Sequence, residues 1–146
     1  MKTAAYVLKS KANQTTHTIT PEASVFDAVK LMADKDIGAV VVMVGSKVAG
    51  LVTERDYARK ITLMSRQSKD TPVREIMTSD VLYVCPERTT DECMALMTEN
   101  RVRHLPVMDG DRLLGLISIG DLVKDIISEQ QFIIQQLEHY IAGDRG

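Results

Sequence analysis

GLVTERD, residues 50–56, returns 65 residues further along the chain as GLISIGD, residues 115–121. The same shift aligns residues 21–61 with residues 86–126 without a gap, and eleven of these positions are identical. The identical pairs are Pro21/Pro86, Glu22/Glu87, Leu31/Leu96, Met32/Met97, Val42/Val107, Met43/Met108, Gly45/Gly110, Gly50/Gly115, Leu51/Leu116, Asp56/Asp121 and Ile61/Ile126. Matches at one fixed spacing, several of them at prolines and glycines, indicate that one supersecondary unit has been duplicated.

Each copy has the pattern of strand, helix, strand, turn, strand and helix. In both copies a hydroxyl residue followed three positions later by an acid predicts the first helix start, and glycine turns separate the next two strands. For the two copies respectively, the opening strands are residues 17–20 and 81–85, the helix starts residues 24–27 and 89–92, and the paired strands residues 39–43 with 48–52 and 105–108 with 113–117. One unit of about 55 residues is near the lower limit for an independent core. We therefore expect an α/β fold in which two tandem β-α-β-β-α repeats pack through their sheets as a pseudo-two-fold pair.

The chain divides into five parts on this pattern. They are an N-terminal segment (1–16), the first repeat (17–66), a linker with a short helix (67–80), the second repeat (81–128) and a helical tail (129–146). The short helix of the linker is expected around Val73 to Met77. The tail continues the last helix of the second repeat and carries an apolar stripe formed by Ile126, Ile133, Leu137 and Ile141. Such a stripe is expected to pack on its own domain or on a second subunit.

Composition narrows the function classes. The 146 residues carry a formal net charge of −2, which supplies no general field for nucleic acid. No apolar run approaches the roughly 20 residues that cross a bilayer, and Lys9 and Lys11 interrupt the start of the chain, which therefore does not resemble a signal peptide. Cys85 and Cys93 have no Cys or His partner at metal spacing, so two free thiols are expected. We predict a cytoplasmic protein that binds neither nucleic acid, nor a membrane, nor a metal.

The repeated motif at residues 50–56 and 115–121 also carries the candidate chemistry. In each copy a hydroxyl at a strand end, Thr53 or Ser118, precedes an aspartate in the first helical turn, Asp56 or Asp121. One interpretation is a capping box that satisfies free backbone amides. The other is a ligand site, because a short carboxylate can accept two hydrogen bonds from the 2′- and 3′-hydroxyls of ribose while the helix N-terminus attracts phosphate. The use of Asp in both copies, where Glu is the better capping partner, favours a ribose phosphate ligand.

The repeated unit with its strand-end G-h-x-[T/S]-x-x-D (h, an apolar residue) resembles a pair of cystathionine-β-synthase-type (CBS) domains, also called a Bateman-type module. Residues 53–56, 101–107 and 118–121 carry the likeness, which extends from about Thr18 to Ile127. The resemblance implies binding of adenosine derivatives in clefts between the two copies. These are AMP, ADP or ATP, and in some members S-adenosylmethionine or NAD(H). It also implies a regulatory module that forms a homodimer and signals to an unidentified downstream protein.

By position in the family, Asp56 and Asp121 hold ribose, and Thr53 and Ser118 lie near ribose or phosphate. The backbone of Ile37, Gly38 and Ala39 and of Val102, Arg103 and His104 is implied to contact the adenine edge. The residues implied to line the base pockets are Thr18, Thr20, Val84, Cys85 and Pro106.

The two copies differ in charge. Arg101, Arg103 and His104 stand where copy one has Asp36, Gly38 and Ala39, so the cleft that uses Asp121 is predicted to suit phosphate better. Alternatively, the arginines form surface ion pairs with Glu99 or Asp109. Copy one carries Arg55 within its motif, and this side chain either serves its own half or contacts phosphate in the other half's cleft.

Three function classes remain after these observations. The leading one is an adenine-nucleotide sensor that signals to a partner. The second is a dimerising interaction protein whose clefts are vestigial, and the Thr/Ser and Asp residues of both halves argue against it. The third is an enzyme, for which the sequence offers no nucleophile with a base, no P-loop, no G-x-G-x-x-G after a strand and no metal set. We therefore predict no enzymatic activity.

Overall fold

The computed structural model describes residues 2–11 and 15–143. Residues 1 and 12–14 of the predicted N-terminal segment and residues 144–146 of the predicted tail lie outside the described residues. The first repeat consists of β1 (Thr18–Ile19), α2 (Val25–Lys35), β2 (Ala39–Val44), β3 (Lys47–Thr53), α3 (Glu54–Tyr57) and the π-helical turn η1 (Ala58–Thr62). The second consists of α4 (Thr90–Asn100), β4 (His104–Asp109), β5 (Arg112–Ser118) and α5 (Ile119–Ile141). Outside the repeats lie α1 (Ala4–Ser10) and the 3₁₀ turn η2 (Val73–Glu75). The predicted α/β fold of two tandem repeats is confirmed.

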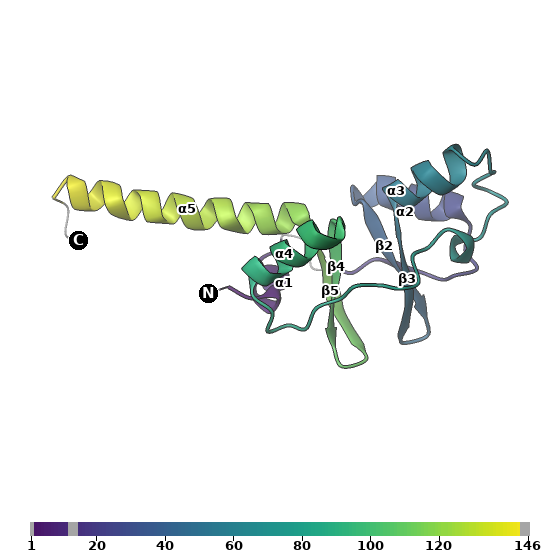
Figure 1. Cartoon of the computed structure of the whole chain (residues 1–146), viewed down its shortest axis with the longest axis horizontal. Helices are drawn as coiled ribbons and strands as arrows, with labels where there is room; N and C mark the ends of the chain where they lie inside the picture. The colour runs from purple at the N-terminus through teal and green to yellow at the C-terminus, as the bar shows by residue number, and fades with distance from the viewer. Residues whose placement is uncertain (1, 12–14, 144–146) are drawn as a thin grey trace.

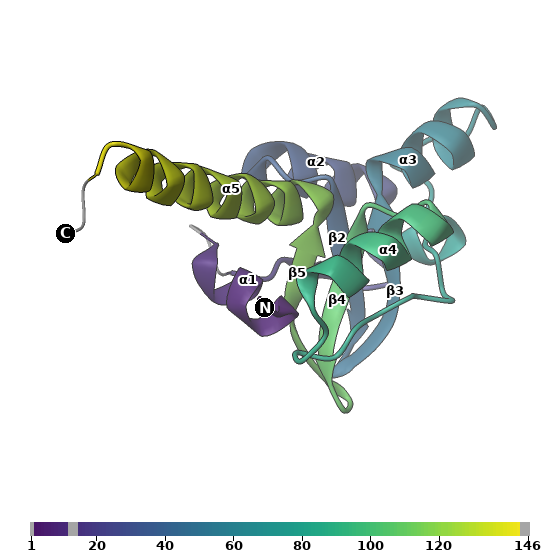
Figure 2. The same cartoon turned by 60° about the vertical axis from the view of Figure 1, so that its left-hand side comes forward.

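The two repeats build the same hairpin. β2 pairs with β3 and β4 with β5, both antiparallel, and the register shifts between Val42 and Met43 in one and between Val107 and Met108 in the other. Gly45 and Gly110 form the turns with φ near +60°, a conformation that glycine adopts without strain. Figure 1 shows the hairpins side by side, and they stay adjacent in the rotated view of Figure 2.

The opening strands are shorter than the sequence predicts. β1 runs parallel to β2 for two residues only, with Thr18 opposite Val41. The predicted strand 81–85 is reduced to a single parallel bridge between Val84 and Val107. The residues before both segments, 16–17 and 81–82, line the space between the repeats that is described below.

The cores follow the helical periodicity of the sequence. α2 buries Val25, Ala28 and Met32 against its own hairpin, and α4 buries Cys93 and Met97. A third cluster joins the repeats through their sheets, with Ala39, Val41 and Leu51 at its centre and partly buried side chains of both repeats around it. This cluster agrees with the predicted packing of the repeats through their sheets.

The N-terminal segment belongs structurally to the second repeat, which the sequence did not reveal. Ala4 and Val7 of α1 are buried in the core of that repeat, and the amides of Ala4 and Ala5 donate to Arg88 O and Pro86 O at 2.8 and 3.0 Å. The side chain of Leu8 lies over Gly115, where a Cβ would come within 2.7 Å of it. The second repeat thus obtains an additional helix from the start of the chain.

Beyond its first turns α5 leaves the body of the molecule (Figure 1). Ile133, Leu137 and Ile141 of the predicted stripe are exposed by 49%, 55% and 83%. Ile126, nearer the start of α5, is partly buried, so only the outer part of the stripe does not pack on its own domain within the described residues, and a second subunit is its predicted partner. None of the helices in the described ranges has both the length and the apolar composition that a bilayer span requires.

Gly50 provides the fold's clearest test of close packing. A Cβ at this position would lie 2.7 Å from Thr78 O and 2.9 Å from Met77 Sδ, because the linker pairs with β3 there. Gly50→Ala should lower the free energy of unfolding by about 1–3 kcal/mol in urea denaturation, since backbone must move to accommodate the methyl group. Gly120→Ala is the matched control: its Cβ would meet nothing closer than Ser118 Oγ at 3.6 Å, so stability should stay level or rise. Equal stability of Gly50→Ala and wild type would contradict the assigned packing.

Candidate functional site

Two clefts lie between the repeats, and each combines the motif of one repeat with the strand entry of the other. The larger, of about 990 Å³, is lined by Ser118 and Asp121 of the second repeat and by residues 37–39 of the first. The smaller, of about 310 Å³, is lined by Thr53 and Asp56 of the first repeat and by residues 102–104 of the second. Both volumes lie in the range of small-molecule sites. Neither cleft exists in a single repeat.

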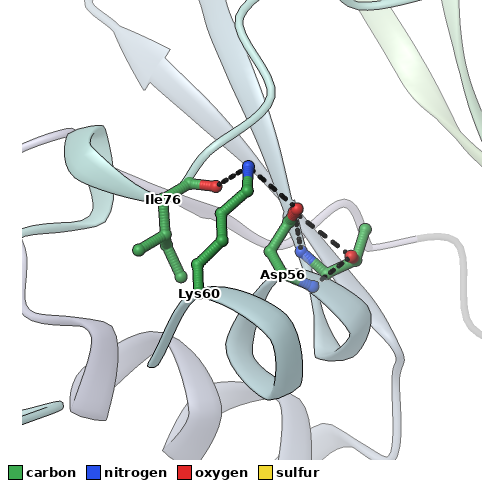
Figure 3. A network of polar contacts seen from close by, with 4 residues as sticks. Asp56, Lys60 and Ile76 are labelled. Carbon is green, nitrogen blue, oxygen red and sulfur yellow. Dashed lines mark hydrogen bonds and ion pairs between the residues drawn. The ribbon is translucent and has the colours of Figure 1, made fainter. Parts of the chain in front are cut away.

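Asp56 closes the first turn of α3 (Figure 3). Its Oδ2 accepts hydrogen bonds from the amide of Thr53 at 3.0 Å and from Thr53 Oγ1 at 3.2 Å, and its own amide donates back to Thr53 Oγ1 at 3.1 Å. The other oxygen, Oδ1, lies 3.4 Å from Nζ of Lys60, which also donates to Ile76 O at 2.9 Å. Asp56 is only 8% exposed. Its carboxylate lies at the edge of the cleft, where Thr53 and Lys60 hold it in place.

Asp121 has the same arrangement at the start of α5. Its Oδ2 accepts from the amide of Ser118 at 2.9 Å, and its amide donates to Ser118 Oγ at 3.1 Å. Nζ of Lys11 lies 3.1 Å from the same Oδ2 and donates to Leu116 O at 2.8 Å. Within the described chain, Asp121 Oδ1 receives no hydrogen bond and remains available as an acceptor.

The capping box interpretation therefore describes the local geometry of both aspartates. A third capping box, Thr89 with Glu92 at the start of α4, lies outside both clefts and uses the longer acid. Only the two boxes built with Asp lie beside a cavity closed by the other repeat. The capping hydrogen bonds reach only Oδ2 of each carboxylate. Capping therefore does not by itself exclude that the carboxylate also accepts hydrogen bonds from a ligand.

Most of the predicted site residues line one of the two clefts. Ile37, Gly38 and Ala39 line the larger cleft with Ser118 and Asp121. Arg55 and Val102 line the smaller cleft with Thr53 and Asp56, and His104 lines both clefts.

The predicted base-pocket residues differ from the lining by a few positions. The residues of that prediction that line neither cleft are Thr18, Thr20, Val84, Cys85 and Pro106. Thr18 pairs with Val41 in the sheet, and Val84 is buried against β4. The preceding residues, 16–17 and 81–82, occupy the clefts instead, at equivalent positions of the two copies.

The arginines lie in a different cleft from the one predicted. Arg101 and Arg103 line the smaller cleft beside Asp56, and not the cleft of Asp121. Arg101 follows α4 in a left-handed conformation with φ of 54°, just as Asp36 follows α2 with φ of 53°, and each strand entry lines the cleft beside the opposite repeat's aspartate. Arg55 Nη1 donates to Arg101 O at 3.0 Å, so Arg55 contacts the cleft of its own aspartate. Among the ion pairs of the described chain, none joins Arg101 or Arg103 to Glu99 or Asp109.

His104 stands where the two clefts meet. A Cβ on Gly38 would lie 3.5 Å from its Cε1 and Nε2, so the imidazole crosses from β4 to the first repeat over a residue without a side chain. Burial lowers the pKa of His104 below 6.5; nearby Asp121 opposes the shift, and Lys11 and Arg103 add to it. His104 is thus neutral at pH 7 and offers a hydrogen bond to the clefts without the positive charge expected from the sequence.

Lysines at the aspartates are the functional candidates that sequence reasoning missed. Lys60 follows Asp56 by four residues on the same helical stretch, a spacing that predicts an ion pair. No local pattern links Lys11 to Asp121, because 110 residues separate them in sequence. Two residues that line the larger cleft each carry a buried polar atom that has no hydrogen-bond partner among the described residues, His17 Nε2 and Asp125 Oδ2. The described residues include no cluster of His, Cys, Asp or Glu that could hold a metal ion.

Comparison with known proteins identifies relatives of the whole chain. A sequence model of the CBS domain matches twice, at residues 13–63 and 73–128. The CBS domain-containing protein CBSX3, mitochondrial, of Arabidopsis thaliana is 40% identical over 149 residues, covering 97% of this chain and 72% of the relative. CBS domain-containing protein YhcV of Bacillus subtilis is 29% identical over 113 residues, covering 77% and 80%.

Solved structures show the same likeness. A protein with CBS domains from Burkholderia ambifaria, provisionally assigned to signal transduction, has 59% sequence identity and a TM-score of 0.85, over 88% of this chain and 96% of that one. A CBS-domain protein of Agrobacterium tumefaciens has 35% identity and a TM-score of 0.79, over 85% and 98%.

The histidine at the junction makes a pH-dependent prediction. Because the native pKa of His104 lies below 6.5, the unfolded chain binds this proton more readily, and stability should fall as the pH is lowered from 6.5 towards the native pKa. An NMR titration of the His104 Cε1 proton should give a midpoint below 6.5, and His104→Gln should flatten the slope of unfolding free energy in this pH window. A midpoint at or above 6.5 would contradict the assigned burial.

Proposed function

The chain belongs to the CBS-domain family as a pair of CBS repeats, a regulatory signal-transduction module, and from that premise we propose that it binds adenine nucleotides in its two clefts. AMP-type ligands, with ADP, ATP or NAD(H) as further members of the class, occupy the cavities beside Asp56 and Asp121. The ligand state then passes to a partner protein. Binding and response are its activity, and no reaction is catalysed.

The observation that carries this proposal is the placement of both Asp-containing capping boxes at cavities that the opposite repeat closes. A carboxylate fixed by its own helix start is preorganised to accept the two hydroxyls of a ribose, since its position is set before the ligand arrives. The helix N-terminus next to it favours a phosphate. The unpartnered buried atoms of His17 and Asp125 support a polar ligand in the larger cleft, because such atoms are normally satisfied.

The route from ligand to partner begins at Ser118 and Asp121. These residues begin α5, whose far part stands away from the body (Figure 2). Large apolar side chains along that part are exposed. A ligand that bonds to Asp121 contacts the first turn of this helix and so changes the free energy of its orientations. We propose that a second copy of the chain packs on the stripe, as predicted for a homodimer, and that the downstream protein recognises the paired form.

A dimerising interaction protein with vestigial clefts is the second candidate, and the exposed stripe of α5 is the observation that favours it. On that account the aspartates are capping residues alone. The compartment stays a prediction: a cytoplasmic location is expected from the sequence, whereas the Arabidopsis relative is mitochondrial by name.

Removing the carboxylate charges separates the two candidates. Asp121→Asn should weaken AMP binding at the larger cleft about tenfold or more by isothermal calorimetry, because the charged acceptors of the diol are lost. Asp56→Asn should weaken AMP binding at the smaller cleft in the same way. The double variant should bind AMP in neither cleft. Glu92→Gln is the matched control, since it alters a capping box outside both clefts; it should share the small loss of stability and retain AMP binding. Absence of AMP binding by the wild-type chain would favour the vestigial-cleft protein, and AMP binding by the double variant equal to that of wild type would refute the ribose role of the two aspartates.

Arg103 tests the phosphate position of the smaller cleft. Arg103→Ala should weaken AMP binding at that cleft several-fold more than adenosine binding, because a charge-assisted bond to phosphate is removed. Arg112→Ala, at the exposed start of β5 and outside both clefts, is the control of equal charge. Calorimetry of both ligands in the Asp121→Asn background isolates the smaller cleft, and equal losses for the two ligands would refute a phosphate role.

A further inference from the structure

In the larger cleft, the carboxylate of Asp121 is paired with a lysine that belongs to neither repeat. Lys11 follows α1, outside both repeats, and its Nζ lies 3.1 Å from Asp121 Oδ2 and 2.8 Å from Leu116 O. The side chains of Lys11 and Asp121 are only 28% and 21% exposed, so the pair is partly shielded from water. A diol that takes both oxygens of Asp121 competes with this ammonium group for Oδ2.

Competition of this kind affects ligands unequally. A neutral nucleoside that displaces Lys11 leaves a partly buried ammonium without its counterion, which is costly. A nucleotide brings its own negative charge into the same cavity, and the displaced ammonium group then gains a charge-assisted hydrogen bond to phosphate. The ion pair therefore lowers affinity for the nucleoside more than for the nucleotide.

The charges around Lys11 are compatible with a phosphate. Besides Lys11, the lysines lining the cavity include Lys2, Lys35 and Lys124, and the acids are Asp36, Asp121 and Asp125. Asp125 is held by Lys2 at 3.1 Å and Asp121 by Lys11 at 3.1 Å, so two of these three acids already have a cation. His104 is neutral at pH 7 and adds no competing charge.

We propose that Lys11 is a specificity-determining residue that makes the Asp121 cleft select phosphorylated adenosine ligands over adenosine itself. In the ligand-free protein the ammonium group occupies the diol acceptor. In the complex the diol binds Asp121 and the ammonium group of Lys11 binds phosphate. This inference rests on the proposed nucleotide binding and adds to it the class of ligand that the larger cleft takes.

In the smaller cleft, and within the described residues, the aspartate is not paired with a lysine of the N-terminal segment. Its aspartate is paired with Lys60, which comes from the same helical stretch and also bonds to the linker at Ile76 O. Because Lys11 is tied to α1, and α1 is packed into the second repeat through Ala4 and Val7, occupancy of the larger cleft also changes a contact of the N-terminal segment. The two clefts therefore differ in what the ligand must displace.

Lys11→Met tests the inference in the full chain, with Asp56→Asn as background so that calorimetry reports on the larger cleft. Adenosine affinity should rise, AMP affinity should fall, and the preference for AMP over adenosine should drop about tenfold. Lys11→Arg, which keeps the charge, should retain most of the preference. Lys47→Met removes the same charge at the exposed start of β3, outside both clefts, and it should leave adenosine affinity unchanged because no ion pair of Asp121 is broken.

The outcomes separate the inference from the proposed function. If the background protein binds AMP and Lys11→Met keeps the full preference, or if its adenosine affinity does not rise, Lys11 is not the specificity residue and nucleotide binding stands. If the wild-type chain and the background protein bind neither ligand, the proposed function itself is refuted and the inference with it. Urea denaturation of each variant verifies that α1 remains packed.

Discussion

Burial of two small sheets against each other is the constraint on which the rest of this structure depends. Neither hairpin can cover both of its faces alone, and the cluster centred on Ala39, Val41 and Leu51 is formed with side chains of both repeats. Ala39 closes that cluster and also lines the larger cleft, and Leu51 does the same for the smaller cleft. The packing that stabilises the fold therefore also creates the sites, and a single repeat would have neither.

Each aspartate caps its own helix and lines a cleft, so the proposed ligand role does not compete with its role in the fold. At each strand-to-helix turn, one oxygen of the carboxylate accepts a hydrogen bond from the backbone amide of the N-cap residue. This hydrogen bond orients the aspartate side chain. Unlike a simple capping residue, each aspartate also forms an ion pair with a lysine. Lys60, from the same helical stretch, pairs with Asp56, and Lys11, from the N-terminal segment, pairs with Asp121. This pairing is the basis of the proposal that the clefts discriminate ligands by charge as well as by shape.

The duplication made the fold predictable from sequence, because matched prolines, glycines and capping residues mark the same turns in both copies. Strand entries 37–39 and 102–104 were placed at the clefts by the resemblance to CBS domains. Two features were not predictable. The cleft that Arg101 and Arg103 line depends on how the two repeats pack, because the strand entry of the second repeat closes the cleft beside Asp56, and no local pattern specifies that packing. The pairing of Lys11 with Asp121 joins segments far apart in sequence, so only the folded chain reveals it. The offset in the base-pocket residues, from 18 and 84 to 16–17 and 81–82, is smaller and arises because the strands begin later than their β-prone runs.

A crystal structure of the chain grown with AMP tests the central claim most directly. The account predicts AMP in at least one cleft, with both ribose hydroxyls within hydrogen-bond distance of the Asp56 or Asp121 carboxylate and the adenine against residues 102–104 or 37–39 of the opposite repeat. AMP-grown crystals in which both clefts hold no nucleotide, and in which Lys60 and Lys11 still occupy the two carboxylates, would contradict it.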